Sequence, residues 1–436
     1  MNRKLFAGAV LLVGLILIAG CTEQPQAGEE LKIGVVASMT GSASTTGKDI
    51  WQSAVLAVEE INADGGVYIT DVGHKVPVRA VLGDDESTRE GGQKAVTRLI
   101  TEDKVDILTG GFSSAVVSAH QSIVAQYGIP YIVTGASSPI ITRRDDVDTS
   151  TIFHYCPTTD DYGRQTTLFV SEVIRPAVQE RFGFPDDRPL RLALIYQDSP
   201  YGKGVQAAVI ETIEKENLPV VLVAQETFAM GETDYRTLLT RVKAAKPDVV
   251  YPATFINEQI PLLTQARRDV GVNAIFLAVE CNDDPDYYAG VGRYGDFSVI
   301  ETRFNPYTIP VGPVADDTAR FREQFEKRWG GFPGMMGAST YEGVYIAVQA
   351  VENAGTREKN AVTAALAALE MPEMVEAMEG GVVRFTDEYR EARFALYMVQ
   401  LRWDDGANAV RPVIVWPDNL AQGEFVLPDW FEASPA

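Results

Sequence analysis

The sequence is poor in the two residue types that most often bind transition metals. Its 436 residues include three cysteines and three histidines, and the histidines stand far apart at positions 74, 120 and 154. Neither the HExxH nor the CxxC spacing occurs, so we expect no histidine–cysteine metal site and no bound cofactor. The chain is also far too long for a small domain that depends on disulfides.

Positive charge is scarce as well. The chain has 38 lysines and arginines against 60 acidic residues, which gives a formal net charge of −22. Phosphate binding needs clustered basic side chains, so this balance argues against a nucleic-acid partner. An ordinary hydrophobic content of 46% and a mean hydropathy close to zero exclude a disordered chain and a polytopic membrane protein.

The motifs of common enzyme classes are also missing. Residues 34–47 contain no GxGxxG, and neither a GxxxxGKS/T phosphate loop nor a GxSxG nucleophile elbow occurs. Neither His120 nor His154 belongs to a recognisable arrangement with a serine or cysteine nucleophile. The sequence therefore predicts a protein that is not an enzyme and has no catalytic residues.

The amino terminus has the features of a secretory signal. Two basic residues precede an uncharged apolar run, Leu5–Gly20, which ends in small residues before Cys21. The final Ile-Ala-Gly-Cys resembles a lipobox, at which a signal peptide is cut and the new terminal cysteine is lipidated. We predict a signal peptide over residues 1–20, then lipidated Cys21 and a flexible tether over residues 21–30. The alternative is an uncleaved anchor helix, and either arrangement places the rest of the chain outside the cytoplasmic membrane.

Strand-like and helix-like segments alternate through the rest of the chain. Residues 31–36 are rich in β-branched side chains, and a helix that starts near Lys48 places its apolar residues on one face. The alternation pauses over the polar stretch 142–158, resumes up to Val279, and ends in strand-like runs up to Trp416. This pattern predicts an α/β fold in which two parallel sheets, each flanked by helices, are joined by several crossings.

Two consecutive predicted strands end in small and hydroxyl residues. These turns are residues 109–114 (TGGFSS) and 134–139 (TGASSP). Ligands of open parallel sheets bind beyond the carboxyl ends of the strands, where free helix N–H groups favour an anion such as a carboxylate. The alternative is that Ser113 and either Ser137 or Ser138 only cap helices.

The predicted second lobe offers acidic and aromatic candidates. Acidic residues cluster after the strand that ends at Val279, where a buried carboxylate would pair with a ligand ammonium and an exposed run would be a solvated loop. Tyr201 and Phe255 follow strand ends and are candidates to cover an apolar part of the ligand. Cys156 and Cys281 also follow strands, and the sequence leaves open whether they form a disulfide.

Several short motifs in a fixed order resemble one known family. They are KIGVVASMTG at residues 32–41, AVEEINADGG at 57–66, YGKG at 201–204, PDVVY at 247–251, QAR at 265–267 and GVVRF at 381–385. Over residues 31–416 the chain resembles the type I substrate-binding proteins of ABC transporters, in the leucine/isoleucine/valine-binding branch. A lipobox in front of such a chain is typical of the members anchored at the cell surface.

The resemblance implies a type I periplasmic-binding-protein fold, with two Rossmann-like lobes joined by three crossover segments around one ligand. The implied limits are residues 31–152 plus 302–384 for lobe 1, residues 153–301 plus 385–420 for lobe 2, and a carboxy-terminal tail over residues 421–436.

The resemblance also implies roles for individual residues. Ser113 and Ser137 match hydroxyl donors to an amino-acid carboxylate, Gly135 matches a backbone contact, and Tyr201 and Phe255 match walls of the opposite lobe.

The remaining positions match the family less closely. The resemblance places the ammonium-binding carboxylate at or near Asp296. The surrounding sequence RYGDFS departs from the family pattern, so Glu280 is the alternative candidate, or fallback. Thr46 stands where several amino-acid binders have a tryptophan or tyrosine. This departure widens the expected ligands from branched-chain amino acids to amides, urea and aromatic acids.

The predicted function is therefore an extracytoplasmic solute-binding lipoprotein, held on the membrane through Cys21. It captures a small polar solute, expected to be an amino acid, and delivers it to the permease subunits of an ABC transporter. The alternatives are a ligand-sensing surface receptor ectodomain and, least favoured, a surface hydrolase.

Overall fold

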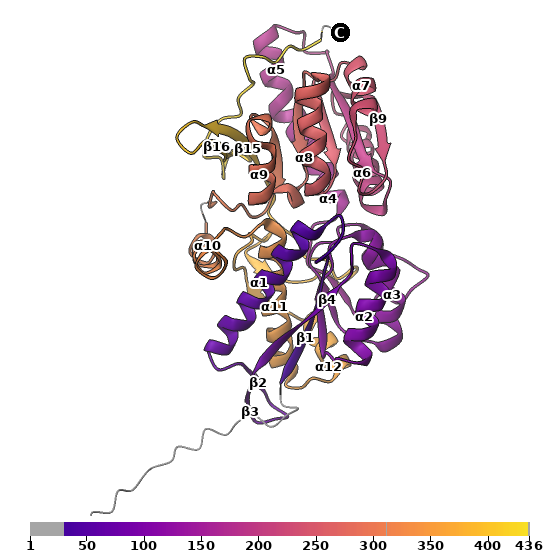
Figure 1. Cartoon of the computed structure of the whole chain (residues 1–436), viewed down its shortest axis with the longest axis vertical. Coiled ribbons are helices and arrows are strands. Elements are labelled where there is room, and N and C mark those ends of the chain that lie inside the picture. Colours follow the sequence, from indigo (N-terminus) through magenta and orange to yellow (C-terminus); the bar gives the residue numbers. More distant parts are fainter. Residues whose placement is uncertain (1–29, 311, 435–436) are drawn as a thin grey trace, which may run out of the picture.

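Two separate β-sheets, each flanked by helices, organise the chain (Figure 1). The computed structural model describes residues 30–310 and 312–434. The predicted signal peptide and Cys21 lie outside the described residues. Within those ranges no helix is both long and apolar enough to cross a membrane.

The first sheet has five parallel strands, and its central strand is buried because helices cover both faces. In spatial order the strands are β4 (Val78–Asp84), β1 (Leu31–Ala37), β5 (Ile107–Gly110), β6 (Tyr131–Val133) and β7 (Ile152–His154). Helices α1 (Ser44–Ala63) and α11 (Met335–Ala354) pack together on one face, and α2 (Arg89–Thr101) packs with α3 (Ser114–Tyr127) on the other (Figure 1). Helix α12 (Lys359–Ala367) packs against α11.

The second sheet repeats the same strand order and adds an antiparallel pair at one edge. Its parallel strands are β9 (Val220–Phe228), β8 (Leu190–Gln197), β10 (Val249–Ala253), β11 (Ile275–Ala278) and β12 (Val299–Thr302), followed by antiparallel β15 (Tyr397–Asp404) and β16 (Ala409–Trp416). Its helices are α4 (Thr159–Phe169), α5 (Arg175–Phe182), α6 (Pro200–Lys215), α7 (Arg236–Ala244), α8 (Ile256–Thr264) and α9 (Pro285–Val291).

The chain passes between the sheets three times. It leaves β7 for α4, returns after β12 to α10 (Ala315–Trp329), which packs against α1, and leaves the first sheet again before β15. The predicted two-lobed α/β fold with three crossings is confirmed. The predicted limits of the lobes and of the carboxy-terminal tail stay a prediction.

Some local elements differ from the sequence-based expectation. Helix α1 begins at Ser44, one turn before the expected start near Lys48. A small hairpin of β2 (Val67–Ile69) and β3 (His74–Val76) follows α1, and a two-residue pair joins β13 (Met371–Pro372) to β14 (Val382–Val383). These strands of two or three residues are too short to show the alternation that identifies longer strands in a sequence.

In both sheets the strand order reverses next to the first strand, and such reversals create a crevice at the carboxyl ends of the strands. The reversals lie between β1 and β5 and between β8 and β10. The loops after β5 and β10 face each other, because Phe112 of the first loop contacts Phe255 of the second with ring centroids 4.5 Å apart. The fold therefore places the two crevices against one another.

Candidate functional site

A small cavity lies where the two crevices meet, with a volume of about 10 Å³, which holds roughly one water molecule. The two lobes are therefore closed tightly on one another, and a larger ligand fits between them only when they separate. Both lobes line the cavity, with Phe112, Ser114, Gly135, Ser137, Tyr162, Tyr201, Phe255, Val279, Glu280, Cys281 and Met336.

The first lobe contributes the amino-terminal end of α3. Two glycines with φ of +88° and +82°, Gly110 and Gly111, turn the chain from β5 into this helix. A side chain at Gly111 would collide with the hydroxyl of Tyr131, so only glycine fits the turn. Ser113 is the residue before α3, and its hydroxyl makes no capping bond. The side chain of Ser113 therefore does not act as a helix cap.

Backbone donors at this end of α3 are also free. None of the hydrogen bonds among the described residues uses the amide N–H of Ser114 or Ala115. The hydroxyl of Ser114 accepts the N–H of Ser138 at 3.1 Å, which ties the two hydroxyl-rich turns together and leaves Ser137 at the cavity. Free N–H groups at a helix start attract an anion.

The second lobe contributes aromatic walls. Phe255 lies at the start of α8 and its ring stacks on Tyr201 of α6, with centroids 5.5 Å apart. The hydroxyl of Tyr201 is buried and has no hydrogen-bond partner among the described residues. Burial raises the pKa of Tyr201 well above its ordinary value, so the phenol keeps its proton and can donate.

Glu280 is the acidic residue that lines the cavity. It opens a short turn directly after β11, and the hydroxyl of Tyr162 donates to its Oε1. Arg303 Nη1 donates to both of its oxygens at 3.0 and 2.9 Å. Burial raises the pKa of Glu280 to about 7, and the positive charge of Arg303 opposes that rise.

Ser113, Asp296 and Thr46 are not among the residues that line the cavity, although both neighbours of Ser113, Phe112 and Ser114, are. Asp296 lies before β12, where its Oδ1 accepts the N–H of Trp403 at 2.8 Å and so ties this turn to β15. Thr46 is buried in the first turn of α1. The geometry thus moves the candidate ammonium acceptor from Asp296 to the fallback, Glu280.

The acidic run after β11 is not a solvated loop, because three of its carboxyl groups are buried. Asn305 and Tyr288 donate to Asp283, and Asp284 caps α9 by accepting the N–H of Asp286 at 2.7 Å. Burial raises the pKa of Asp283 to about 7. These two carboxyl groups support the local fold, while Glu280 faces the cavity.

Several cavity residues were not predicted from the sequence. Phe112 belongs to a turn that was singled out for its hydroxyls, and Tyr162 and Met336 come from helices whose sequences resemble ordinary packing segments. Only the strand order and the three crossings bring them together. A turn next to two glycines is the one local pattern that points to Phe112.

The two cysteines are free and buried, so no disulfide joins them. Cys281 lines the cavity and its Sγ lies 3.3 Å from the carbonyl oxygen of Thr254. Burial raises the pKa of Cys156 to about 12 and that of Cys281 well above its ordinary value, so both stay thiols at neutral pH. No metal-binding group of three or more His, Cys, Asp or Glu residues occurs in the described part of the chain.

Hydrogen bonds join the two lobes directly. Asn257 Nδ2 donates to the carbonyl oxygen of Ser42 at 2.6 Å, and Thr45 donates to Asn257 Oδ1 at 3.3 Å. The amide N–H of Met335 donates to the carbonyl oxygen of Asp283 at 3.0 Å. The structure is therefore a closed arrangement, in which a ligand between the lobes is shielded from solvent.

Comparisons with known proteins agree with this architecture. The model of the periplasmic binding protein family matches residues 30–407. Leu/Ile/Val-binding protein homolog 7 of Brucella melitensis is 26% identical over 428 residues, which cover 96% of this chain and 99% of that protein.

Two solved structures share the fold. The branched-chain amino acid transporter substrate binding protein LivJ from Streptococcus pneumoniae, in complex with isoleucine, has a TM-score of 0.72 and 21% identity, and covers 89% of this chain and 100% of its own. A solute binding protein of an ABC transporter from Rhodopseudomonas palustris, in complex with 3,4-dihydroxybenzoic acid, has a TM-score of 0.73 and 18% identity, and covers 90% and 98%.

The chain belongs to the periplasmic binding protein family, whose members bind solutes outside the cytoplasm and are not enzymes. Its fold is the type I periplasmic-binding-protein fold.

Proposed function

We propose that the protein binds an amino acid in its zwitterionic form. The observation that supports this most directly is the separation of donors and acceptor across the cavity. On the first lobe, Ser114, Gly135 and Ser137 line the cavity and the N–H groups of Ser114 and Ala115 are free, and on the second lobe the carboxylate of Glu280 lines it. A ligand with a carboxylate at one end and an ammonium group at the other satisfies both.

The side chain of this amino acid lies against aromatic rings. Phe112, Phe255 and Tyr201 form one continuous aromatic wall, and Met336 lies on the same cavity. Such a wall gains most from an apolar or aromatic ligand side chain. The names of the Brucella relative and of the isoleucine complex from Streptococcus pneumoniae support the same class.

An aromatic acid without an amino group is the second candidate. The wall formed by Phe112 and Phe255 favours it, and the neighbour from Rhodopseudomonas palustris holds 3,4-dihydroxybenzoic acid. Such a ligand leaves the free acceptor capacity of Glu280 unused, so the carboxylate would keep a proton instead.

We also propose that lipid on Cys21 anchors the protein to the cytoplasmic membrane and that closure around the ligand presents it to the permease. The lipobox supports the anchor, and the contacts of Asn257 with Ser42 support a closed form stabilised by ligand. In the host, Cys21→Ser should move the protein from the membrane fraction to the soluble fraction, whereas Cys156→Ser should not.

A thermal-shift screen of the chain from Thr22 onward tests the ligand class. The panel contains L-leucine, L-isoleucine, L-valine, L-phenylalanine, benzoate and 3,4-dihydroxybenzoate. A ligand at 100 times its dissociation constant adds about 2.7 kcal/mol to the free energy of unfolding, enough to raise Tm by several degrees. A shift with amino acids alone supports the proposal, and a shift with the two aromatic acids alone rejects it in favour of the second candidate.

A further inference from the structure

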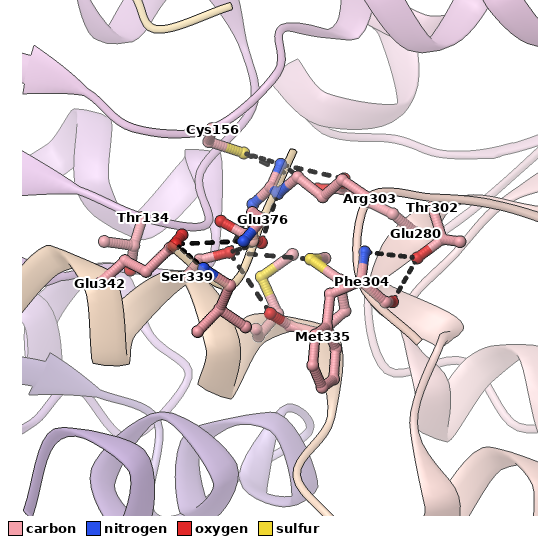
Figure 2. Close-up of polar contacts among 12 residues, drawn as sticks. Thr134, Cys156, Glu280, Thr302, Arg303, Phe304, Met335, Ser339, Glu342 and Glu376 are labelled. Atoms are coloured by element: carbon pink, nitrogen blue, oxygen red, sulfur yellow. Dashed lines mark hydrogen bonds and ion pairs between the residues drawn. The ribbon is translucent and has the colours of Figure 1, made fainter. Parts of the chain in front are cut away.

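A buried ionic cluster adjoins the cavity through Glu280, which belongs to both (Figure 2). Its centre is Arg303, the first residue after β12, whose side chain is fully buried. Arg303 pairs with Glu280 at 2.9 Å on one side and with Glu376 at 2.7 Å on the other. Ser339 bridges the second pair, since it accepts from Arg303 and donates to Glu376 Oε1. One guanidinium is thus shared by two buried carboxylates.

A third carboxyl group in the cluster adds no charge. Glu342 of α11 accepts the amide N–H groups of Val375 and Glu376 at 2.6 and 3.1 Å. Burial, followed by the charge of Glu376, raises the pKa of Glu342 well above its ordinary value. Oε2 of Glu376 has no hydrogen-bond partner among the described residues.

The remaining titratable neighbours leave the balance negative. Burial raises the pKa values of the Cys156 thiol, the Tyr162 phenol and the Glu301 carboxyl, so these three groups are neutral at pH 7. Asp283, with a pKa of about 7, can only add negative charge. Arg303 is the basic residue bonded to the cluster, so its one guanidinium is shared by two carboxyl groups, and the cluster has an excess of one negative charge whenever both are ionised.

That excess charge reaches the cavity through Glu280. Neither Arg303 nor Glu376 lines the cavity, whereas Glu280 does. Oε1 of Glu280 accepts from Tyr162, Arg303 and the Cys156 thiol, whereas Oε2 accepts only one bond from Arg303 among the described residues, so the free acceptor position lies on Oε2. In a low-dielectric interior an unbalanced carboxylate is costly, so it takes up either a proton or a cationic partner.

We infer that Glu376, from outside the cavity, selects ligands that carry an ammonium group, because it competes with Glu280 for their shared counterion Arg303. This inference rests on the proposed function and names the group that the ligand must bring. With Glu376 ionised, the ligand ammonium completes the charge balance of the cluster. With Glu376 neutral, Arg303 alone balances Glu280, and the ammonium group loses its electrostatic advantage.

The test compares ligand pairs that differ only in the ammonium group. Calorimetric titrations measure L-leucine against 4-methylpentanoate and L-phenylalanine against 3-phenylpropanoate. The wild-type chain, Glu376→Gln and Glu342→Gln are compared at pH 8. We expect Glu376→Gln to reduce the preference for the amino acid about tenfold. Glu342→Gln is the matched control, because it replaces a group that is already neutral, and it should leave the preference unchanged.

A measurement on the wild type keeps the inference testable even where a variant fails to fold. At pH 7, titration of L-leucine in two buffers of different ionisation enthalpy reports the protons released on binding. An ammonium group that replaces the proton of Glu280 releases about half a proton per ligand. The deaminated acid should release none.

The outcomes separate the inference from the proposed function. If the wild type binds none of the four probes, both fail. If it binds an amino acid, but Glu376→Gln keeps the wild-type preference or binding releases no proton, the inference fails and the proposed function stands. If the deaminated acids bind as tightly as the amino acids, the ammonium group has no role and the inference is overturned.

Discussion

The two walls of the cavity are built from different parts of the chain. The first-lobe wall is local, because two glycine-containing turns next to each other in the sheet supply Ser114, Gly135 and Ser137. The second-lobe wall is assembled over long distances, since Glu280 depends on Arg303 from one crossing and on Tyr162 beyond another. The comparison shows that a wall built from neighbouring turns can be found in a local sequence pattern, whereas the charge that balances a buried carboxylate cannot.

Removal of the second-lobe carboxylate should have the largest effect. Glu280→Gln deletes the acceptor for the ligand ammonium, and a lost buried charged hydrogen bond costs about 2–5 kcal/mol. We expect the affinity for the best amino acid of the screen to fall at least about 30-fold by calorimetry. The matched control is Asp296→Asn, which changes a carboxylate bonded to Trp403 away from the cavity and should bind normally. Equal losses in both variants would contradict the assignment of Glu280.

Removal of a first-lobe donor should have a smaller effect. Ser113→Ala deletes one hydroxyl from a wall that keeps its backbone N–H groups, so binding should weaken by about 1–3 kcal/mol. Ser118→Ala, farther along α3, removes a hydroxyl that bonds only to the carbonyl oxygen of Ala115 and serves as the control. An unchanged affinity in Ser113→Ala would remove this hydroxyl from the site.

The pH dependence of binding should come from the second lobe alone. The pKa of Glu280 is raised to about 7, so the carboxyl group is protonated below that pH and ionised above it. An ammonium ligand needs the ionised form, so its affinity should fall about tenfold between pH 8 and pH 6. Titrations across this range in the Ser113→Ala variant should show the same slope. A flat profile in the wild type would contradict the role of Glu280.

A smaller effect, on the stability of the folded chain, should come from acidic residues at the contact between the two lobes. Asp49 of the first lobe and Asp284 of the second both lie close to Gly334, and burial raises both pKa values, that of Asp49 to about 7. The folded chain therefore binds more protons than the unfolded chain between about pH 4 and pH 7, and stability falls as pH rises through 7. We expect Tm without ligand to be a few degrees lower at pH 8 than at pH 5.

The Asp49→Asn variant should reduce that pH dependence, because it removes one of the buried carboxyl groups whose pKa is raised. Asp71→Asn is a suitable control, since Asp71 is exposed in the turn between β2 and β3. A pH dependence of Tm that survives unchanged in Asp49→Asn would place its origin elsewhere in the chain.

Much of the fold was predictable from the sequence because it follows from regular patterns. The alternation of β-branched runs and amphipathic helices predicts two parallel sheets, and the turns around Ser113 and Ser137 predict where an anion binds. The role of Arg303 was not predictable, because nothing near it marks a residue of the second crossing as buried. Its importance depends on three segments, around Glu280, Ser339 and Glu376, that are far apart in the chain. Asp296 shows the opposite error. The resemblance to the family assigned this residue to the ligand site, whereas in the structure its carboxylate bonds to Trp403 of β15.

Cys281 provides a natural reporter of lobe movement. Cys281 lines the cavity between two lobes that Asn257, Ser42 and Thr45 hold together, while Cys156 is buried in the first crossing. A thiol reagent reaches Cys281 only while the lobes are apart, so the alkylation rate of the unmodified protein measures the fraction of time the cleft is open. A bound ligand should slow that rate in proportion to its occupancy, which permits affinity to be measured without a label.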